Sequence, residues 1–220
     1  MDTFSLKGKS ILVTAGSTWV KIDTVRVITN IFKGKIGFTI AEIAAHMGAD
    51  VTLLLGPSFD LSTYKPAANL NILRFKFFDE LDTLMKSELE KRPYDAVVHS
   101  AAVSDFRLAT EYDGKIKSDT DTLTLELVPT KKIVDYIKDI LPHTFLIKFK
   151  LEVNVTEDRL KDIAFKSLQH SRADLIVANI YNPAFADHEA FLMDTTGESR
   201  KISGREHIAQ SILKEIHDRT

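Results

Sequence analysis

The residues best suited to chemistry in this sequence lie in one short segment, 26–37. The segment begins with an arginine, continues through Asn30 and ends with Gly34 and Gly37, directly before a helical pattern. Exposed N–H groups and the dipole at a helix start favour a phosphate or a carboxylate, and glycines let an anion approach closely. A tight turn shaped by the same glycines explains their spacing equally well. The segment is therefore a candidate anion site, with a structural turn as its alternative.

The elements around this segment predict an α/β fold. A run rich in β-branched residues at 10–14 is typical of a buried strand, and the pattern at 37–47 is typical of an amphipathic helix. Repeated βα units of this kind predict a doubly wound, mostly parallel, Rossmann-like sheet. Further strands are expected near 50–55, 71–75, 94–100, 145–150 and 174–178, and further helices near 79–91, 131–140 and 156–168.

Three stretches depart from this alternation. Residues 15–33 form a long aperiodic loop, whereas strand-to-helix connections usually take about 2–6 residues. Residues 107–130 are charged and rich in turns, with an alternating strand pattern at 123–128, and predict a mobile flap with a small β excursion. A C-terminal hairpin is expected near 190–202, before a last helix.

The loops after the predicted strands are expected to share one crevice. Open parallel sheets bind ligands at the carboxyl ends of their strands. The loops after Thr14, Ser100, Lys150 and Ala178 should therefore converge, and the segment 26–37 belongs to the first of them.

Composition narrows the class of protein. A chain of 220 residues with 44% hydrophobic content can bury a full core, so we expect one nucleotide-binding-like α/β domain over 1–220. The 29 basic and 31 acidic residues are intermixed, which argues against a nucleic-acid partner. The absence of cysteine excludes a thiolate zinc site and a cysteine nucleophile. No signal segment or long apolar run is present, so we expect a cytoplasmic protein with no membrane partner.

A series of short motifs follows one order along nearly the whole chain. This order resembles that of phosphopantothenoylcysteine synthetase, a family of α/β ligases. The motifs lie at residues 11–18, 22–26, 28–30, 34–37, 101–107, 115–117, 127–130, 149–152 and 173–179.

The resemblance implies a ligase of coenzyme A biosynthesis. In the family, the carboxylate of 4′-phosphopantothenate takes a nucleotidyl group from CTP or ATP with release of pyrophosphate, and the cysteine amine then displaces the nucleotide. Mg²⁺ and cationic groups offset the negative charge of this step. CTP is the co-substrate we expect first. A homodimer with its active site at the subunit interface is implied, and we expect a stand-alone form without a decarboxylase domain.

The same resemblance gives roles to individual residues. Asn30 would contact the pantothenate amide and stabilise the acyl-nucleotide intermediate, and Arg26 would reach a substrate bound mainly by the other subunit. Lys115 would close over the triphosphate and stabilise departing pyrophosphate. Asp105 would bind substrate and help to hold Mg²⁺. Further substrate contacts fall to Ala101 and Ala102, and nucleotide contacts to Gly16, Phe32, Gly34, Gly37, Lys117, Phe149, Lys166 and Asn179.

Ordinary structural roles remain open for several of these residues. Asn30 and Asp105 could each cap a turn, and Arg26 could form a surface ion pair. Lysines in polar loops are usually only solvated, and Phe149 taken alone would belong to the core.

The nucleotide half of the expected site differs from the family pattern. The family usually has a second glycine in the first loop and a hydroxyl residue shortly before the helix that begins near residue 37. It also usually has a glycine before the phenylalanine of the strand at 145–150 and two lysines on the helix before residue 173. The departing residues are Ser17, Phe32, Lys148, Ser167 and Ser171.

Two other functions compete with the ligase. One is a catalytically weak relative that binds nucleotide, or a partner decarboxylase, as a regulatory module. The other is a nicotinamide-dependent short-chain oxidoreductase, which the missing G-x-G-x-x-G fingerprint argues against.

Overall fold

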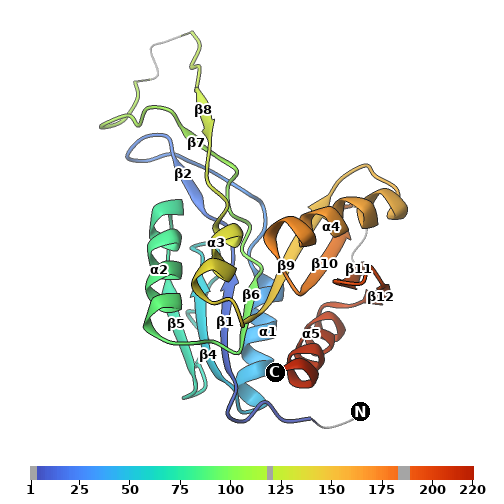
Figure 1. Ribbon diagram of the computed structural model, residues 1–220. Helices are drawn as coiled ribbons and strands as arrows, with labels where there is room; N and C mark the ends of the chain where they lie inside the picture. The colour runs from blue at the N-terminus through green and yellow to red at the C-terminus, as the bar shows by residue number, and fades with distance from the viewer. Residues whose placement is uncertain (1–3, 118–120, 183–188) are drawn as a thin grey trace.

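The computed structural model describes residues 4–117, 121–182 and 189–220, and an eight-stranded sheet runs through this part of the chain (Figure 1). The strand order is β12-β11-β10-β9-β6-β1-β4-β5. All neighbours pair in parallel except β10 with β11 and β11 with β12, which are antiparallel. The strands are β1 (Ser10–Ala15), β4 (Asp50–Leu55), β5 (Leu70–Arg74), β6 (Ala96–His99), β9 (Phe145–Glu152), β10 (Leu175–Ile180), β11 (Glu189–Asp194) and β12 (Ser199–Ser203).

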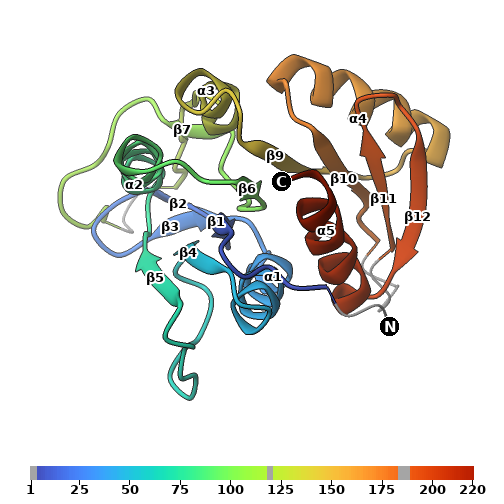
Figure 2. The ribbon, with the colours of Figure 1, turned by 60° about the horizontal axis from the view of Figure 1, so that its bottom comes forward.

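Helices cover both faces of this sheet, which confirms the predicted doubly wound, mostly parallel α/β fold. Figure 2 shows α1 and α5 on one side and α2, α3 and α4 on the other. The central strands are rich in apolar residues because both faces are covered; in β1, Ile11 and Val13 face the first pair of helices and Leu12 faces the others. The helices are α1 (Lys35–His46), α2 (Phe78–Lys91), α3 (Ile133–Ile140), α4 (Glu157–Ser171) and α5 (Arg205–Arg219).

The predicted C-terminal hairpin is present and extends the sheet. Strands β11 and β12 pair antiparallel, with Ala190 opposite Ile202, and β11 adds to β10. Both residues are buried against α5 and the core of that face. The hairpin is therefore part of the main sheet rather than an appendage.

Two short antiparallel ribbons project from one end of the molecule, and we call them together the arm (Figure 1). One pairs β2 (Trp19–Lys21) with β3 (Val27–Thr29), and the other pairs β7 (Phe106–Leu108) with β8 (Leu127–Pro129). The prediction that 15–33 is an aperiodic loop was therefore wrong, and the strand predicted at 123–128 is confined to the start of β8. All three residues of β3 are exposed, so no apolar alternation marks this strand.

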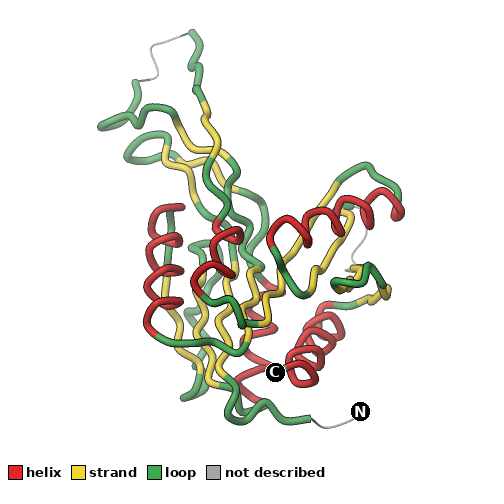
Figure 3. The backbone as a smooth tube through the Cα atoms, viewed as in Figure 1, coloured by secondary structure: helices red, strands yellow, loops and turns green. Residues whose placement is uncertain are grey.

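Most of the arm is irregular chain between these strands, as Figure 3 shows. The arm is formed by the loops that follow β1 and β6, and these two strands are neighbours in the sheet. A third loop joins it after β5, where the Trp19 amide donates to the Lys76 carbonyl at 2.7 Å and the Trp19 ring lies edge-on to Phe77. The predicted β excursion is confirmed, and its position above two adjacent strands brings distant segments together.

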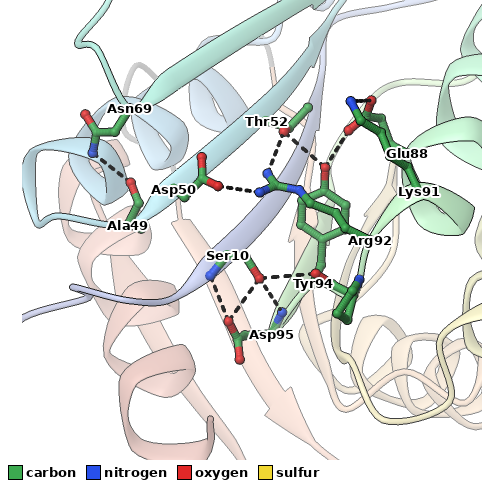
Figure 4. Close-up of polar contacts among 11 residues, drawn as sticks. Ser10, Ala49, Asp50, Thr52, Asn69, Glu88, Lys91, Arg92, Tyr94 and Asp95 are labelled. Carbon is green, nitrogen blue, oxygen red and sulfur yellow. Dashed lines mark hydrogen bonds and ion pairs between the residues drawn. The ribbon is translucent and has the colours of Figure 1, made fainter.

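A polar network closes the opposite, amino-terminal edge of the sheet (Figure 4). Asp95 accepts from the amide and the hydroxyl of Ser10, the first residue of β1, at 2.7 and 3.0 Å. The buried Tyr94 hydroxyl donates to Glu88 of α2 at 2.6 Å and lies 3.0 Å from Thr52 Oγ1 of β4. These bonds join β1, β4 and α2 at the edge remote from the arm.

Candidate active site

Close backbone packing fixes the start of α1 against the loop after β1. Gly34 has a φ of 82°, and a Cβ there would lie 2.2 Å from the amide nitrogen of Gly16. A Cβ on Gly37 would lie 2.3 Å from Ser100 Oγ, in the loop after β6. Only glycine fits either position, because a side chain would overlap the neighbouring backbone or Ser100. No side chain caps this helix start, and its first N–H groups have no acceptor within the helix.

Asn30 meets the loop after β6 directly above this packing. Its Nδ2 atom donates to the Ala102 carbonyl at 3.1 Å, and the Ala102 amide donates to the Gly16 carbonyl at 2.9 Å. The Ala101 amide in turn donates to the hydroxyl of Thr14, near the end of β1, at 3.1 Å. Four of the residues chosen from the sequence thus lie in one bonded cluster, with the rest of the Asn30 amide exposed.

Phe32 continues this cluster toward β10. Its carbonyl accepts from the hydroxyl of Ser17 at 2.6 Å, so two of the residues that depart from the family pattern contact each other. The Phe32 ring lies edge-on to Tyr181, with ring centres 5.5 Å apart. Tyr181 follows the end of β10, two residues after Asn179. Phe32 therefore connects the first loop with the strand end where Asn179 lies.

Arg26 lies in the turn between β2 and β3 and contacts the flap. Its Nη2 atom donates to the Ile116 carbonyl at 3.1 Å, and its Nη1 atom lies 3.4 Å from the Asp23 carboxylate. Lys115 and Lys117 flank Ile116 and are exposed, and neither has a hydrogen bond or ion pair with another residue that the structure describes. Arg26 thus forms an ion pair, as its structural alternative predicted, and this pair fixes it beside the two flap lysines.

Asp105 is the residue that the family resemblance assigns to Mg²⁺. It is exposed at the start of the second ribbon and pairs with Lys132. Within the described ranges, no group of three or more His, Cys, Asp or Glu side chains is arranged to hold a metal ion. A single exposed carboxylate does not form an all-protein metal site, but it fits Mg²⁺ that arrives bound to a triphosphate, since such ions take one or two carboxylates and keep phosphate and water ligands.

The remaining predicted nucleotide residues are more dispersed. Phe149 lies in β9 and is partly buried against the core on the α1 face. Asn179 pairs with Leu151 where β10 and β9 extend past the shorter strand β6. Lys166 is exposed on α4, and no contact among the described residues links it to the cluster around Asn30. Phe149 and Asn179 lie on neighbouring strands, whereas Lys166 is not brought to the loops.

Lys148 occupies a buried position on the α3 and α4 side of the sheet. Its ammonium donates to Ser167 Oγ and Ser171 Oγ, both at 3.0 Å, and to the Ser167 carbonyl at 3.1 Å. The three residues that depart from the family pattern in this region therefore bind one another. Burial lowers the pKa of Lys148, and the neighbouring Lys150 and Lys132 add to this effect against the opposing influence of Asp135.

His99 lies beside Lys148 at the end of β6. It is buried, with Nδ1 3.1 Å from the Thr14 hydroxyl, and burial together with the Lys148 ammonium lowers its pKa to about 4. The imidazole is therefore neutral near pH 7. Thr14, His99 and Lys148 are therefore buried polar groups on adjacent strands, below the loops that carry Asn30 and Ala102.

Sequence reasoning assigned no role to Asp23, Tyr181, His99 or Lys148. Asp23 lies inside the motif at 22–26, but its carboxylate is buried through a contact with Ile116, which is far away along the chain. For Lys148 the signal was its place within the apolar run 145–149 of β9, which indicates a buried charge that needs partners.

Fold and loops define an α/β protein of Rossmann-like architecture whose candidate site lies at the carboxyl ends of β1 and β6. A family model described as the DNA/pantothenate metabolism flavoprotein C-terminal domain matches residues 6–219. The chain belongs to this family, and the resemblance to phosphopantothenoylcysteine synthetase drawn from its motifs is confirmed.

Individual relatives agree with this assignment. The chain is 43% identical over 185 residues to the coenzyme A biosynthesis bifunctional protein CoaBC of Thermococcus kodakarensis, covering 84% of this chain and 44% of that protein. The DNA/pantothenate metabolism flavoprotein structure from Streptococcus pneumoniae has a TM-score of 0.87 and 31% identity, over 96% of this chain and 99% of that one. The C-terminal domain of a CoaBC protein has a TM-score of 0.77 and 27% identity, over 97% and 96%. The chain spans about half the length of the curated relatives it matches.

Proposed function

We propose that this chain joins 4′-phosphopantothenate to L-cysteine, using a nucleoside triphosphate and releasing pyrophosphate and the nucleoside monophosphate. The observation that carries the proposal is the contact between Asn30 and the Ala102 carbonyl above the Gly16 and Gly34 packing. This contact and the packing beneath it bring four separate motifs of the family to one place. We propose that the residues 1–220 act as one domain, in the cytoplasm.

The first step is attack of the pantothenate carboxylate on the α-phosphorus of the triphosphate. A carboxylate oxygen bonds to phosphorus while the bond to the pyrophosphate oxygen breaks, and both reactants are anions. The N–H groups at the start of α1, which no side chain caps, and the ammonium of the exposed Lys115 supply positive potential where this charge develops. Mg²⁺ carried by the triphosphate would neutralise further charge, with Asp105 as the protein carboxylate within this region.

The second step is attack of the cysteine amine on the acyl carbon. The new C–N bond forms as the bond to the nucleotide oxygen breaks, and the amine loses a proton. Asn30 keeps part of its amide exposed while one N–H is held by Ala102, so it is oriented to hydrogen-bond the acyl group in the intermediate. Phe32, Phe149 and Asn179 lie on the nucleotide side. We propose CTP as the preferred triphosphate, with ATP as the alternative.

A homodimer is part of the proposal. The arm leaves apolar side chains exposed, among them Ile31 at 69% and Val25 at 64% of full exposure. Exposed apolar residues grouped on a projecting element mark an association surface. They flank Arg26 and Asn30, so a second copy bound there would meet the site itself.

The test is pyrophosphate release by purified protein with phosphopantothenate, Mg²⁺ and CTP or ATP, with and without cysteine. We expect release with CTP, and formation of phosphopantothenoylcysteine only when cysteine is added. Absence of turnover with either triphosphate would contradict the ligase and favour a regulatory nucleotide-binding relative. A change in nicotinamide absorbance on adding a reduced cofactor would instead indicate an oxidoreductase.

A further inference from the structure

We infer that Asp23 is a positioning residue that anchors the flap segment carrying Lys115 to the turn between β2 and β3. The inference rests on the proposed function through the role of Lys115. It assigns a function to a buried carboxylate that does not itself touch the proposed substrates.

The Asp23 carboxylate connects two segments that are about ninety positions apart in the chain. Its Oδ1 atom accepts from the amides of Val25 and Arg26 at 2.9 and 2.8 Å, which closes the turn. Its Oδ2 atom accepts from the Ile116 amide at 3.1 Å, which joins the turn to the flap across 93 positions. The same carboxylate therefore shapes one segment and holds the other.

Two more bonds complete the anchoring of the flap. The Thr24 amide donates to the Gly114 carbonyl at 3.1 Å, and Arg26 Nη2 donates to the Ile116 carbonyl at 3.1 Å. The backbone is thus held on both sides of Lys115, at Gly114 and at Ile116. Lys115 itself remains exposed. The bonds therefore fix the position of its backbone and leave its ammonium group available to a ligand.

The Asp23 carboxylate is buried, and its hydrogen bonds and ion pair offset the free-energy cost of this burial. Its side chain is fully covered although it lies in the arm, outside both apolar cores. Burying a carboxylate is unfavourable unless hydrogen bonds and opposite charge compensate. Burial opposes ionisation, but the amides of Val25, Ile116 and Arg26 and the Arg26 guanidinium outweigh it and hold the pKa of Asp23 below its ordinary value. The carboxylate stays charged and keeps accepting these bonds at neutral pH.

The variant Asp23→Asn tests the inference. Its single carbonyl oxygen can still close the turn, but its amide group would face the Ile116 N–H with another donor. We expect faster hydrogen exchange in the peptide 111–117 and a fall of about tenfold in kcat for pyrophosphate release. In a Lys115→Ala background, measured in single turnovers, the same change should lower the rate by less than about twofold, because Asp23 acts through Lys115.

Asp60→Asn is the matched control. Asp60 also accepts a turn bond, from the Ser62 amide at 2.8 Å, but it is exposed and the bond stays within its own loop. This variant should leave exchange in 111–117 and pyrophosphate release unchanged. If Asp23→Asn does not fold, Asp23→Ser replaces it, since serine supports the same turn with a shorter side chain.

The outcomes separate the inference from the proposed function. Unchanged exchange in 111–117, or an equal loss of rate in the Lys115→Ala background, would overturn the positioning role of Asp23. Absence of pyrophosphate release by the wild-type protein would reject the proposed function, and the exchange measurement would then decide the anchoring by itself.

Discussion

At the scale of single residues, the side-chain amide of Asn30 and the buried imidazole of His99 carry most of the chemistry that can be tested. Asn30 has one N–H held by the Ala102 carbonyl and the rest of its amide exposed. His99 lies beneath the same loops, buried between the Thr14 hydroxyl and the Lys148 ammonium. The first residue bears on turnover and the second on how folding depends on pH.

Replacing Asn30 by aspartate should remove turnover without unfolding the protein. Asn30→Asp loses the N–H donors and places a negative charge beside an anionic substrate, so we expect kcat to fall by about 10²-fold or more. The side chain is exposed, so the unfolding midpoint in urea should stay within error. Asn71→Asp, an exposed change on the edge strand β5, is the control and should retain activity. A rate close to wild type for Asn30→Asp would contradict the assigned role.

His99 should make the folded state less stable in mild acid. Its folded pKa of about 4 lies below its ordinary 6.5, so the unfolded chain takes up a proton first as the pH falls. Its contribution to stability is complete above about pH 6.5 and is lost toward pH 4, by at most about 1.4 kcal/mol per pH unit. Urea unfolding at pH 7 and pH 5 should show a smaller drop for His99→Gln than for wild type, whereas exposed His143→Gln should match wild type.

At the scale of elements, the carboxyl ends of the strands carry the candidate site, whereas their amino ends contribute to stability. The carboxyl ends of β1 and β6 lead into the arm and the candidate site. The amino ends are closed by the network around Ser10, Tyr94 and Asp95. A change at the amino end should therefore affect the free energy of unfolding and leave the proposed chemistry intact.

Tyr94→Phe tests this separation. Burial and the nearby Glu88 carboxylate raise the pKa of Tyr94, so its hydroxyl remains protonated and donates to Glu88. Its removal leaves a buried carboxylate without this donor and should lower the free energy of unfolding by about 1–2 kcal/mol. Denaturant unfolding measures this loss, and kcat for pyrophosphate release at 25 °C should be unchanged. The exposed Tyr112→Phe should leave stability unaltered.

At the scale of the whole molecule, the arm is the projecting element whose apolar side chains are exposed in a single copy of the chain. It carries Arg26 and Asn30 on one ribbon, among exposed apolar residues. No helix among the described residues is long and apolar enough to cross a membrane. A second copy of the chain is the partner proposed for the arm, and it would bring two sets of these residues together.

Mixing two inactive variants tests whether one site uses residues from both copies. If Arg26 of one subunit serves the site that holds Asn30 of the other, a heterodimer of Arg26→Ala and Asn30→Ala contains one intact site. Random pairing makes half of the dimers heterodimers, so co-expression should restore about one quarter of wild-type activity. Each variant alone should remain inactive. No recovery in co-purified heterodimers would place both residues in the same subunit's site.

By itself, the sequence determined the order of the main-sheet strands and the helices, the parallel sheet and the family. Local patterns suffice for these, because strands covered on both faces are rich in apolar residues and the motifs occur in sequence order. The tertiary structure decided what the arm contains and which residues meet. Strands as short as β3 have no periodic pattern, and the contacts of Asp23 with Ile116 and of Lys148 with Ser171 join segments that only folding brings together.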